Sequence, residues 1–286
     1  MPQIQEIERK IKGVRSLKDI VHSMRSLAAV NLYKAEKALQ SIRKYRVMIQ
    51  EGLGLADHLI SDRTRVTDKA DLPTGCLIFT SDQGLSGSFN ERIIDFVQDQ
   101  STQYRKPLYM VCGVRGQDML KQKKNDVFLN ISAPTSLDGT KRAMRDLSDT
   151  LYLHFNEGRF GSLILFYNVY ASAGRFTPTV VPILPLDATR FAGKKSLRTS
   201  PHLYLTPEEL LPLLIEEYLF IELYRAFVES IASENGSRLR SMDNAGKNID
   251  KKIDELMQIY RISRQEEITS EMLEIISGAE AIEIAR

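Results

Sequence analysis

The amino-acid sequence predicts an α/β protein with two parts: an antiparallel coiled coil of long N- and C-terminal helices, and a central, mostly parallel α/β domain. Three observations predict this fold. Apolar residues recur at alternating steps of three and four at both ends, four apolar runs alternate with helical patterns in the middle, and the two ends carry opposite charge. The 286 residues, 43% hydrophobic and 27% charged, fall in the globular range. We expect a coiled-coil helix in residues 1–60, the α/β domain in 70–200 and a second coiled-coil helix in 206–286.

The N-terminal segment predicts one long helix. Its apolar positions run from Ile4 to Ile49, and no proline occurs in residues 3–71. The spacing has one irregularity, between Val14 and Leu17, which we interpret as a local phase shift of the coiled coil. The expected helix has about 55 residues and, at ~1.5 Å per residue, is on the order of 80 Å long.

The C-terminal segment predicts a second, longer helix. Residues 206–209 read Thr-Pro-Glu-Glu, which is typical of a capping box with proline at the first helical position. Pro212 should bend the helix one turn later. From Val228 to Tyr260 the apolar positions alternate steps of four and three without a break, and the helix should run to about Ala281. Its tail is too long for the first helix to cover, and the apolar side chains left over there are Ile268, Met272, Ile275, Ile276 and Ile282.

The charges favour pairing of these two helices. Residues 1–60 hold 11 Lys and Arg against 6 Asp and Glu, whereas residues 208–286 hold 9 against 17. A long helix is marginal in water unless its apolar stripe is covered, so the basic and acidic helices should cover each other. The seam is thin, because Ala28 and Ala35 allow close approach and Asn31, Asn235 and Gly246 trade stability for register.

The middle of the chain predicts a small, mostly parallel, Rossmann-like α/β domain. Apolar runs suited to buried strands occur at 74–80, 107–112, 127–131 and 162–170. Helical patterns lie between them, at 89–104, 116–124 and 138–157. Residues 175–186 contain three prolines and belong at a sheet edge or in a crossing to the coil, and residues 188–200 form a loop.

We expect no catalytic centre, metal site or cofactor. The four histidines are scattered, and no Walker sequence occurs. The turn after the first strand holds Gly84 and Gly87 at a spacing that does not fit a dinucleotide fingerprint, which argues against a nucleotide site there. Because the central domain has α/β character, a nucleotide-binding protein that uses it is still kept as an alternative. Cys76 and Cys112 lie in apolar runs and should be buried, inert thiols.

The sequence also bears on nucleic-acid and membrane partners. Lysines and arginines of the first helix alternate with acids, so we expect no nucleic-acid partner. The longest stretch without a charge, residues 160–174, is fifteen residues and too short to cross a bilayer as a helix. The first residues have neither a signal nor a transit pattern, so we expect a cytoplasmic protein without direct membrane insertion.

Several blocks of the sequence carry a family resemblance. They are Glu6–Val14, Met24–Val30, Ser81–Asn90, Glu222–Ala226, Ala232–Met242, Arg264–Thr269 and Ile275–Ala279. In this order they resemble the gamma subunit of F-type, proton- or sodium-translocating ATP synthases, over nearly the whole chain. The family's Cys and second Gly in the 81–90 turn are Ser86 and Ser88 here, and its acid before the proline of the last helix is Thr206. These departures indicate a divergent bacterial branch.

The resemblance implies a function for the whole chain. A single copy would act as the central rotor shaft, with its coil inside the ring of alternating alpha and beta subunits and its α/β domain on the membrane rotor ring and an epsilon-type subunit. The chain would lie at the cytoplasmic face of the bacterial inner membrane and would catalyse nothing by itself. The alternative from another class is a coiled-coil scaffold without a rotary role.

The resemblance also implies contact residues for the alpha and beta ring. Met24 would lie near the beta-subunit lever loop, and Arg238 and Gln265 would hydrogen-bond to the loops that catch the shaft. Thr269 also matches the family in this region. A simpler interpretation places Met24 in the coiled-coil core and Arg238 and Gln265 on a solvated helix surface.

Overall fold

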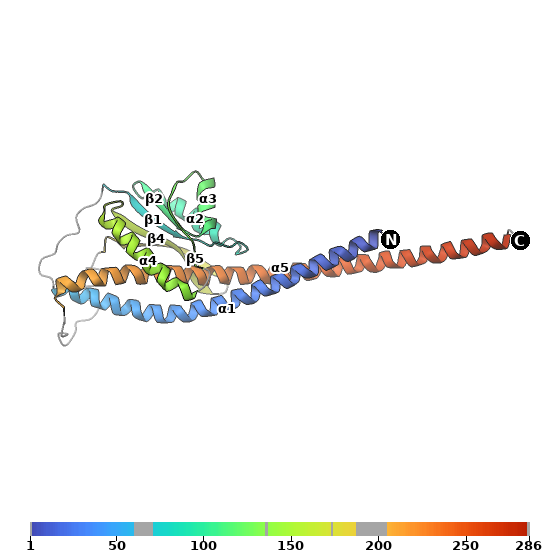
Figure 1. The fold of residues 1–286 in the computed structure, drawn as a ribbon, viewed down its shortest axis with the longest axis horizontal. Coiled ribbons are helices and arrows are strands. Elements are labelled where there is room, and N and C mark those ends of the chain that lie inside the picture. Colours follow the sequence, from blue (N-terminus) through green and yellow to red (C-terminus); the bar gives the residue numbers. More distant parts are fainter. Residues whose placement is uncertain (1, 60–70, 135–136, 173, 187–204, 285–286) are drawn as a thin grey trace. The chain divides into compact units, whose positions relative to one another are not determined.

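The computed structural model describes residues 2–59, 71–134, 137–172, 174–186 and 205–284 (Figure 1). Its helices are α1 (Pro2–Leu59), α2 (Phe89–Ser101), α3 (Val114–Gln122), α4 (Leu137–Asn156) and α5 (Pro207–Ile284). Its strands are β1 (Thr74–Phe79), β2 (Pro107–Cys112), β3 (Val127–Ile131), β4 (Ser162–Ser172) and β5 (Arg175–Leu184). The expected loop at 188–200 and the side chain of Ile282 lie outside the described residues.

The chain forms two compact units. The first consists of residues 1–27 and 240–286, and the second of residues 28–239. We call them the tip unit and the domain unit. The sheet and the three short helices all belong to the domain unit, whereas the tip unit contains only the outer parts of α1 and α5.

The sheet confirms the predicted mostly parallel α/β domain. Its strand order is β3-β2-β1-β4-β5, in which the first four strands are parallel and β5 runs antiparallel to β4. All six residues of β1 are buried, as expected for a central parallel strand. The segment at 175–186 is β5, at the sheet edge, where the missing donors of Pro178 and Pro182 are tolerated.

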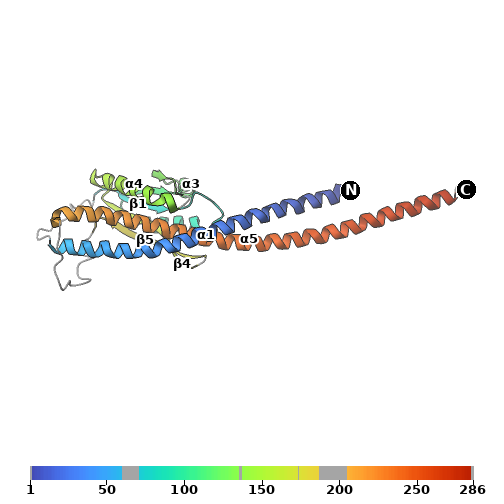
Figure 2. The same ribbon diagram turned by 60° about the horizontal axis from the view of Figure 1, so that its bottom comes forward.

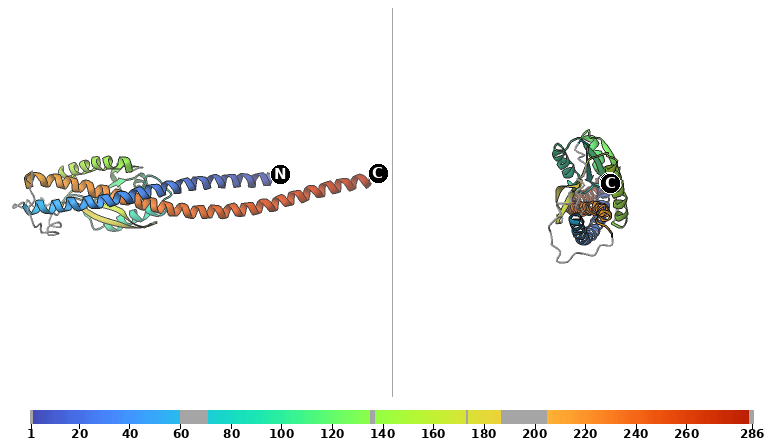
Figure 3. Two further views of the ribbon diagram at one scale, coloured as in Figure 1. Left: turned by 90° about the horizontal axis from the view of Figure 1, so that it is seen from below. Right: turned by 90° about the vertical axis from the view of Figure 1, so that its left-hand side faces the viewer.

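Two apolar layers cover the sheet. On one face Ile78, Val111 and Phe166 pack against α2 and α3. On the other face Leu77, Met110 and Leu165 pack with α4 and with the inner parts of α1 and α5, and the end-on view shows these two long helices side by side (Figure 3). The helical pair is therefore part of the hydrophobic core of the domain unit.

The capping box at the start of α5 is confirmed. The backbone N–H of Glu209 donates to Thr206 Oγ1 at 3.3 Å, and the N–H of Thr206 donates to Glu209 Oε2 at 3.1 Å. The helix continues through Pro212 without ending, and it lies beside α1 in the domain unit (Figure 2).

The tip unit corrects the expected phase shift of α1. Ile7 and Ile11 pack against Leu256, as the spacing predicts, but Leu17 is 54% exposed. Counting steps of four, three and four from Val14 places Lys18, Val21 and Arg25 at the next seam positions, and the two cations pair with Asp250 and Asp243 of α5. The heptad pattern is therefore continuous, and the irregularity arose because charged residues occupy two of its core positions.

Candidate functional site

The carboxyl edge of the sheet is the place where doubly wound folds bind ligands, at the point where strand order reverses. Here that point lies between β1 and β4. On the other side of β1, toward β2, Thr80 Oγ1 donates to the carbonyl of Cys112 at 2.9 Å and accepts from the N–H of Gly116 in α3 at 3.2 Å. A Cβ on Gly116 would lie 2.4 Å from Thr80 Oγ1, so this corner is closed by the chain's own side chain.

An acid of the same chain occupies the start of α3. Asp82 Oδ1 accepts from the N–H of Val114, the first residue of that helix, at 2.9 Å and from the N–H of Ala133 at 3.4 Å. A carboxylate at a helix N-terminus takes the position that a bound phosphate would use. The nucleotide-binding alternative gains no support from this edge of the sheet.

The turn after β1 is also bonded to α5. Ser237 Oγ donates to the carbonyl of Ser86 at 2.6 Å, and Arg238 Nη2 donates to the carbonyl of Gly84 at 3.3 Å. One turn earlier on α5, Ser233 Oγ donates to the carbonyl of Asn168 on β4 at 3.0 Å. The first two bonds join residues 81–90 to residues 232–242, and the third joins α5 to β4.

Arg238 is an internal residue of the domain unit. It is 6% exposed, and its guanidinium also forms an ion pair with Glu234 on the same helix. Burial raises the pKa of the Glu234 carboxyl, against the opposing effect of Arg238, and the nearby charge of Asp82 raises it further. Arg238 thus bonds to the turn after β1, and it does not lie on a solvated helix surface.

The other three predicted contact residues lie in the tip unit. Met24 is half-buried, whereas Gln265 and Thr269 are exposed. Thr269 Oγ1 donates to the carbonyl of Gln265 at 2.8 Å, so the two residues are successive on one helix face. That face carries a shallow groove lined by Ile262, Gln265, Glu266, Thr269, Ser270 and Leu273.

Apolar side chains are exposed along the same stretch of α5. Met272, Leu273 and Ile276 are more than half exposed, and Ile275 is 71% exposed. The predicted overhang is therefore confirmed for the described side chains. An apolar surface of this kind is typical of a site that a protein partner covers.

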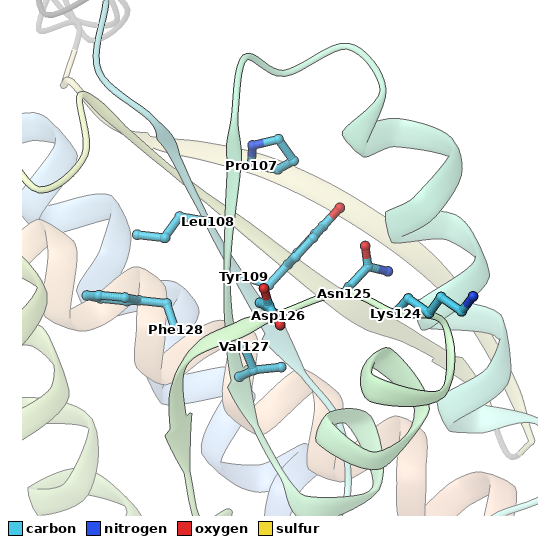
Figure 4. A pocket seen from close by; sticks show the side chains of 8 residues that line it. All are labelled: Pro107, Leu108, Tyr109, Lys124, Asn125, Asp126, Val127 and Phe128. Carbon is cyan, nitrogen blue, oxygen red and sulfur yellow. The ribbon is translucent and has the colours of Figure 1, made fainter.

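A second hollow lies at the amino ends of β2 and β3, opposite the ligand-binding edge (Figure 4). Lys124, Asn125 and Asp126 line it, and the Tyr109 hydroxyl donates to Ser101 Oγ at 3.0 Å. It is open and shallow, with few polar groups directed at one point, so it does not resemble a cofactor site.

The thiols agree with the sequence-based expectation. Cys76 and Cys112 are fully buried, and burial raises the pKa of both, that of Cys76 to about 12. Within the described ranges, no three His, Cys, Asp or Glu side chains are grouped as metal ligands. No helix in the described part of the chain has the length and apolarity needed to cross a membrane.

Sequence reasoning missed two features of the domain unit. The first is Leu85, whose side chain is 60% exposed. Its backbone φ is 63°, a left-handed conformation that is rare for a bulky residue. Glu222 is 0% exposed and forms ion pairs with Arg46 and Arg225. A lone acid within the apolar run at 218–223 was the available signal for this buried cluster.

Comparisons with known proteins agree over the full length. A sequence family described as ATP synthase matches residues 3–282. The ATP synthase gamma chain of Moorella thermoacetica is 30% identical over 289 residues, which cover 99% of this chain and 100% of the relative. The ATP synthase gamma chain of Paracoccus denitrificans is 30% identical over 298 residues, with the same coverage.

Solved structures share the fold. A chain of the Euglena gracilis mitochondrial ATP synthase (OSCP/F1/c-ring, rotational state 3) superposes with a TM-score of 0.65 at 19% identity, covering 98% of this chain and 95% of that one. A chain of the Tetrahymena thermophila enzyme (central stalk/c-ring) gives 0.60 at 19% identity, covering 79% and 99%. Because the family match and the relatives span nearly every residue, this chain belongs to the ATP synthase gamma chain family.

Proposed function

We propose that the chain is the central rotor shaft of a rotary F-type ATP synthase. In this role it couples ion flow through a membrane rotor ring to ATP synthesis or hydrolysis at sites on the beta subunits. The observation that carries the proposal is the exposed apolar tail of α5 in a chain of the gamma family: Met272, Leu273 and Ile275 need a partner, and a ring around the helix supplies one.

The shaft acts by contact and forms no covalent bond. A single asymmetric helical pair within a ring of near-threefold symmetry presents a different face to each catalytic site. Each site then takes the conformation that its local contacts stabilise, and rotation moves every site through the series. The chain itself is therefore the non-catalytic subunit.

The tip unit provides the direct ring contacts in this proposal. Gln265 and Thr269 are exposed on one face and offer an amide and a hydroxyl to the ring loops. Met24 is half-buried, so part of its flexible side chain remains available to the beta-subunit lever loop.

Arg238 has a different place in the proposal. Its guanidinium is bonded to the carbonyl of Gly84, two residues before Ser86, so it acts on the ring through the turn that it holds. The exposed side chain of Leu85, at the centre of this turn, is the one that contacts the alpha and beta ring.

The remaining partners follow from the family. The α/β domain contacts the membrane rotor ring and an epsilon-type subunit, and the chain is peripheral at the cytoplasmic face of the bacterial inner membrane. Thr206 stands where the family has an acid, so the rotor-ring contact differs in detail here.

The first experiment is co-expression with the host's alpha and beta subunits. We expect a complex with one copy of this chain per alpha–beta ring by native mass spectrometry, with ATPase activity that requires the chain. Failure to join the ring would leave the scaffold alternative.

Variants then test the contacts in the purified complex. The double variant Arg238→Ala/Gln265→Ala should slow ATP turnover about tenfold, the equivalent of ~1.4 kcal/mol. Lys252→Ala is the matched control on an exposed part of α5, where Lys252 pairs only within its own helix, with Glu255. Normal synthesis and hydrolysis rates in the double variant would contradict the contact assignment.

A further inference from the structure

Cations recur at heptad-core positions of α1, and each faces an acid of α5. The pairs are Lys18 with Asp250 at 2.7 Å, Arg25 with Asp243 at 2.5 Å, and Arg46 with Glu222. From the first pair to the second, α1 advances by seven residues and α5 goes back by seven; to the third, the steps are 21 and 21. All three pairs therefore have the same antiparallel register.

The third pair differs from the others in burial. Both side chains of the Lys18 and Arg25 pairs are more than two-fifths exposed, whereas Glu222 is fully buried. The Glu222 carboxylate also accepts from Arg225 Nη2 at 2.7 Å and Nε at 3.0 Å, and the Arg225 guanidinium lies 5.4 Å from the Tyr167 ring centre. The cluster thus joins α1, α5 and strand β4.

The buried pair carries the largest penalty when the register changes, because its loss leaves a charge buried without its partner. If α1 slid by one helical turn, Lys18 would face Asp254 or Gly246, so one direction keeps an exposed ion pair. The same slide would place Arg46 opposite Ala226 or Tyr218 and would leave a buried carboxylate without its α1 partner. A charged residue at one core position is a known means of fixing coiled-coil register, at some expense of stability.

We propose that Arg46, Glu222 and Arg225 form the register lock of the shaft, which prevents α1 from sliding past α5 when the α/β domain is twisted. The proposal rests on the rotor-shaft function and adds positioning residues to it. Glu222 touches no substrate, and its effect on coupling is transmitted through the two helices.

A distance measurement on the full chain tests the lock. Spin labels on Lys44→Cys and Glu216→Cys, both at exposed positions of the two helices, report the register, and the native thiols are buried. We expect one narrow distance in the parent chain. The variant Arg46→Met/Glu222→Leu/Arg225→Met replaces the cluster by apolar groups, which usually preserves folding. It should show a second distance, from a slide of about one turn (~5.4 Å).

Two further variants keep this test decisive. Glu222→Gln retains the side-chain shape and should also broaden the distance distribution. Lys123→Met removes an ion pair with Asp95 that lies within the α/β domain, and it should leave the distance unchanged. A single unchanged distance in both cluster variants, with circular dichroism showing a folded chain, would overturn the lock.

The functional readout uses the reconstituted ATP synthase in vesicles. We expect the triple variant to keep ATP hydrolysis and to lose ion uptake per ATP hydrolysed several-fold. An unchanged ratio would contradict a role of the lock in coupling. Absence of the parent chain from the complex would instead contradict the rotor function, and the spin-label result would still decide the register.

Discussion

The domain unit and the tip unit hold the same two helices by different means. In the domain unit α1 and α5 share a core with the sheet, and the fully buried carboxylate of Glu222 forms ion pairs with Arg46 and Arg225. In the tip unit the seam is small, the ion pairs are exposed, and apolar side chains such as Met272 and Ile275 face solvent.

This difference teaches where each unit obtains its stability. The domain unit satisfies its own apolar and polar groups, so substitutions there should be felt in the isolated chain. The tip unit leaves apolar surface uncovered, so substitutions of its exposed side chains should have their main effect when a partner is bound. The following predictions test this contrast.

The largest expected effect is that of Glu222→Leu. Removing the carboxylate leaves Arg46 and Arg225 without their shared partner, and breaking a buried pair in this way costs about 3–5 kcal/mol. Asp250→Leu is the matched change in the tip unit, where Lys18 stays solvated. It should leave the free energy of unfolding unchanged within error. Urea unfolding of both chains, followed by circular dichroism, checks this, and equal shifts would remove the contrast.

The next largest difference between the two units is expected when one side-chain hydroxyl is removed from each. Ser237→Ala removes one of two donors to the buried carbonyl of Ser86, which still accepts from the N–H of Phe89 at 3.3 Å, and should lower the free energy of unfolding by about 0.5–1.5 kcal/mol. Thr269→Ala removes an exposed hydroxyl that bonds only to its own helix, so the isolated chain should keep its stability. In the assembled complex, Thr269→Ala should instead slow ATP turnover. A loss of stability in both variants would contradict the prediction.

The partly buried carboxyl of Glu217 should make the stability of the domain unit depend on pH. Burial raises the pKa of its carboxyl, but hydrogen bonds from Arg145 and Tyr45 outweigh burial and hold the pKa below 4.5. The carboxylate therefore stabilises the fold above about pH 4.5, and this contribution is lost as the pH falls through the lowered pKa. Glu217→Gln should be less stable than the parent at pH 7, with the difference shrinking below pH 4.5. A difference independent of pH, measured by thermal melting, would contradict it.

Much of this fold was predictable from local pattern. The four parallel strands are continuous apolar runs, and the capping box in the sequence indicates where the helix starting at Pro207 begins. The unbroken spacing from Val228 to Tyr260 was sufficient for α5, because its core positions are nearly all apolar.

The apolar spacing was misleading where charged residues occupy heptad core positions of α1. Lys18 and Arg25 were not counted in the seam, because the acids that accept them belong to a distant segment. Arg238 shows the same limit for the site, since the Gly84 carbonyl that it binds is 154 residues away in the chain. The exposure of Gln265 depends on no distant partner, so its expected place on a helix surface was sufficient to predict it.

The smallest effect compares two glycines of α5. Gly246, in the tip unit, has no described atom within 4 Å of the position of an added Cβ, so Gly246→Ala should gain about 0.5–1 kcal/mol of helix propensity. At Gly236, in the domain unit, the Cβ would lie 3.1 Å from the Tyr170 ring and 3.3 Å from the Gly174 nitrogen. There the crowding should exceed the gain, for a net loss of about 1 kcal/mol.

The same substitution on one helix should thus change sign between the units. Denaturation of the two single variants measures it directly, because both differ from the parent by one methyl group. Stabilisation by both would mean that the core of the domain unit yields at Gly236 as readily as solvent does at Gly246. The contrast would then lie in charge burial alone, since close packing of the helix on the sheet would no longer distinguish the two units.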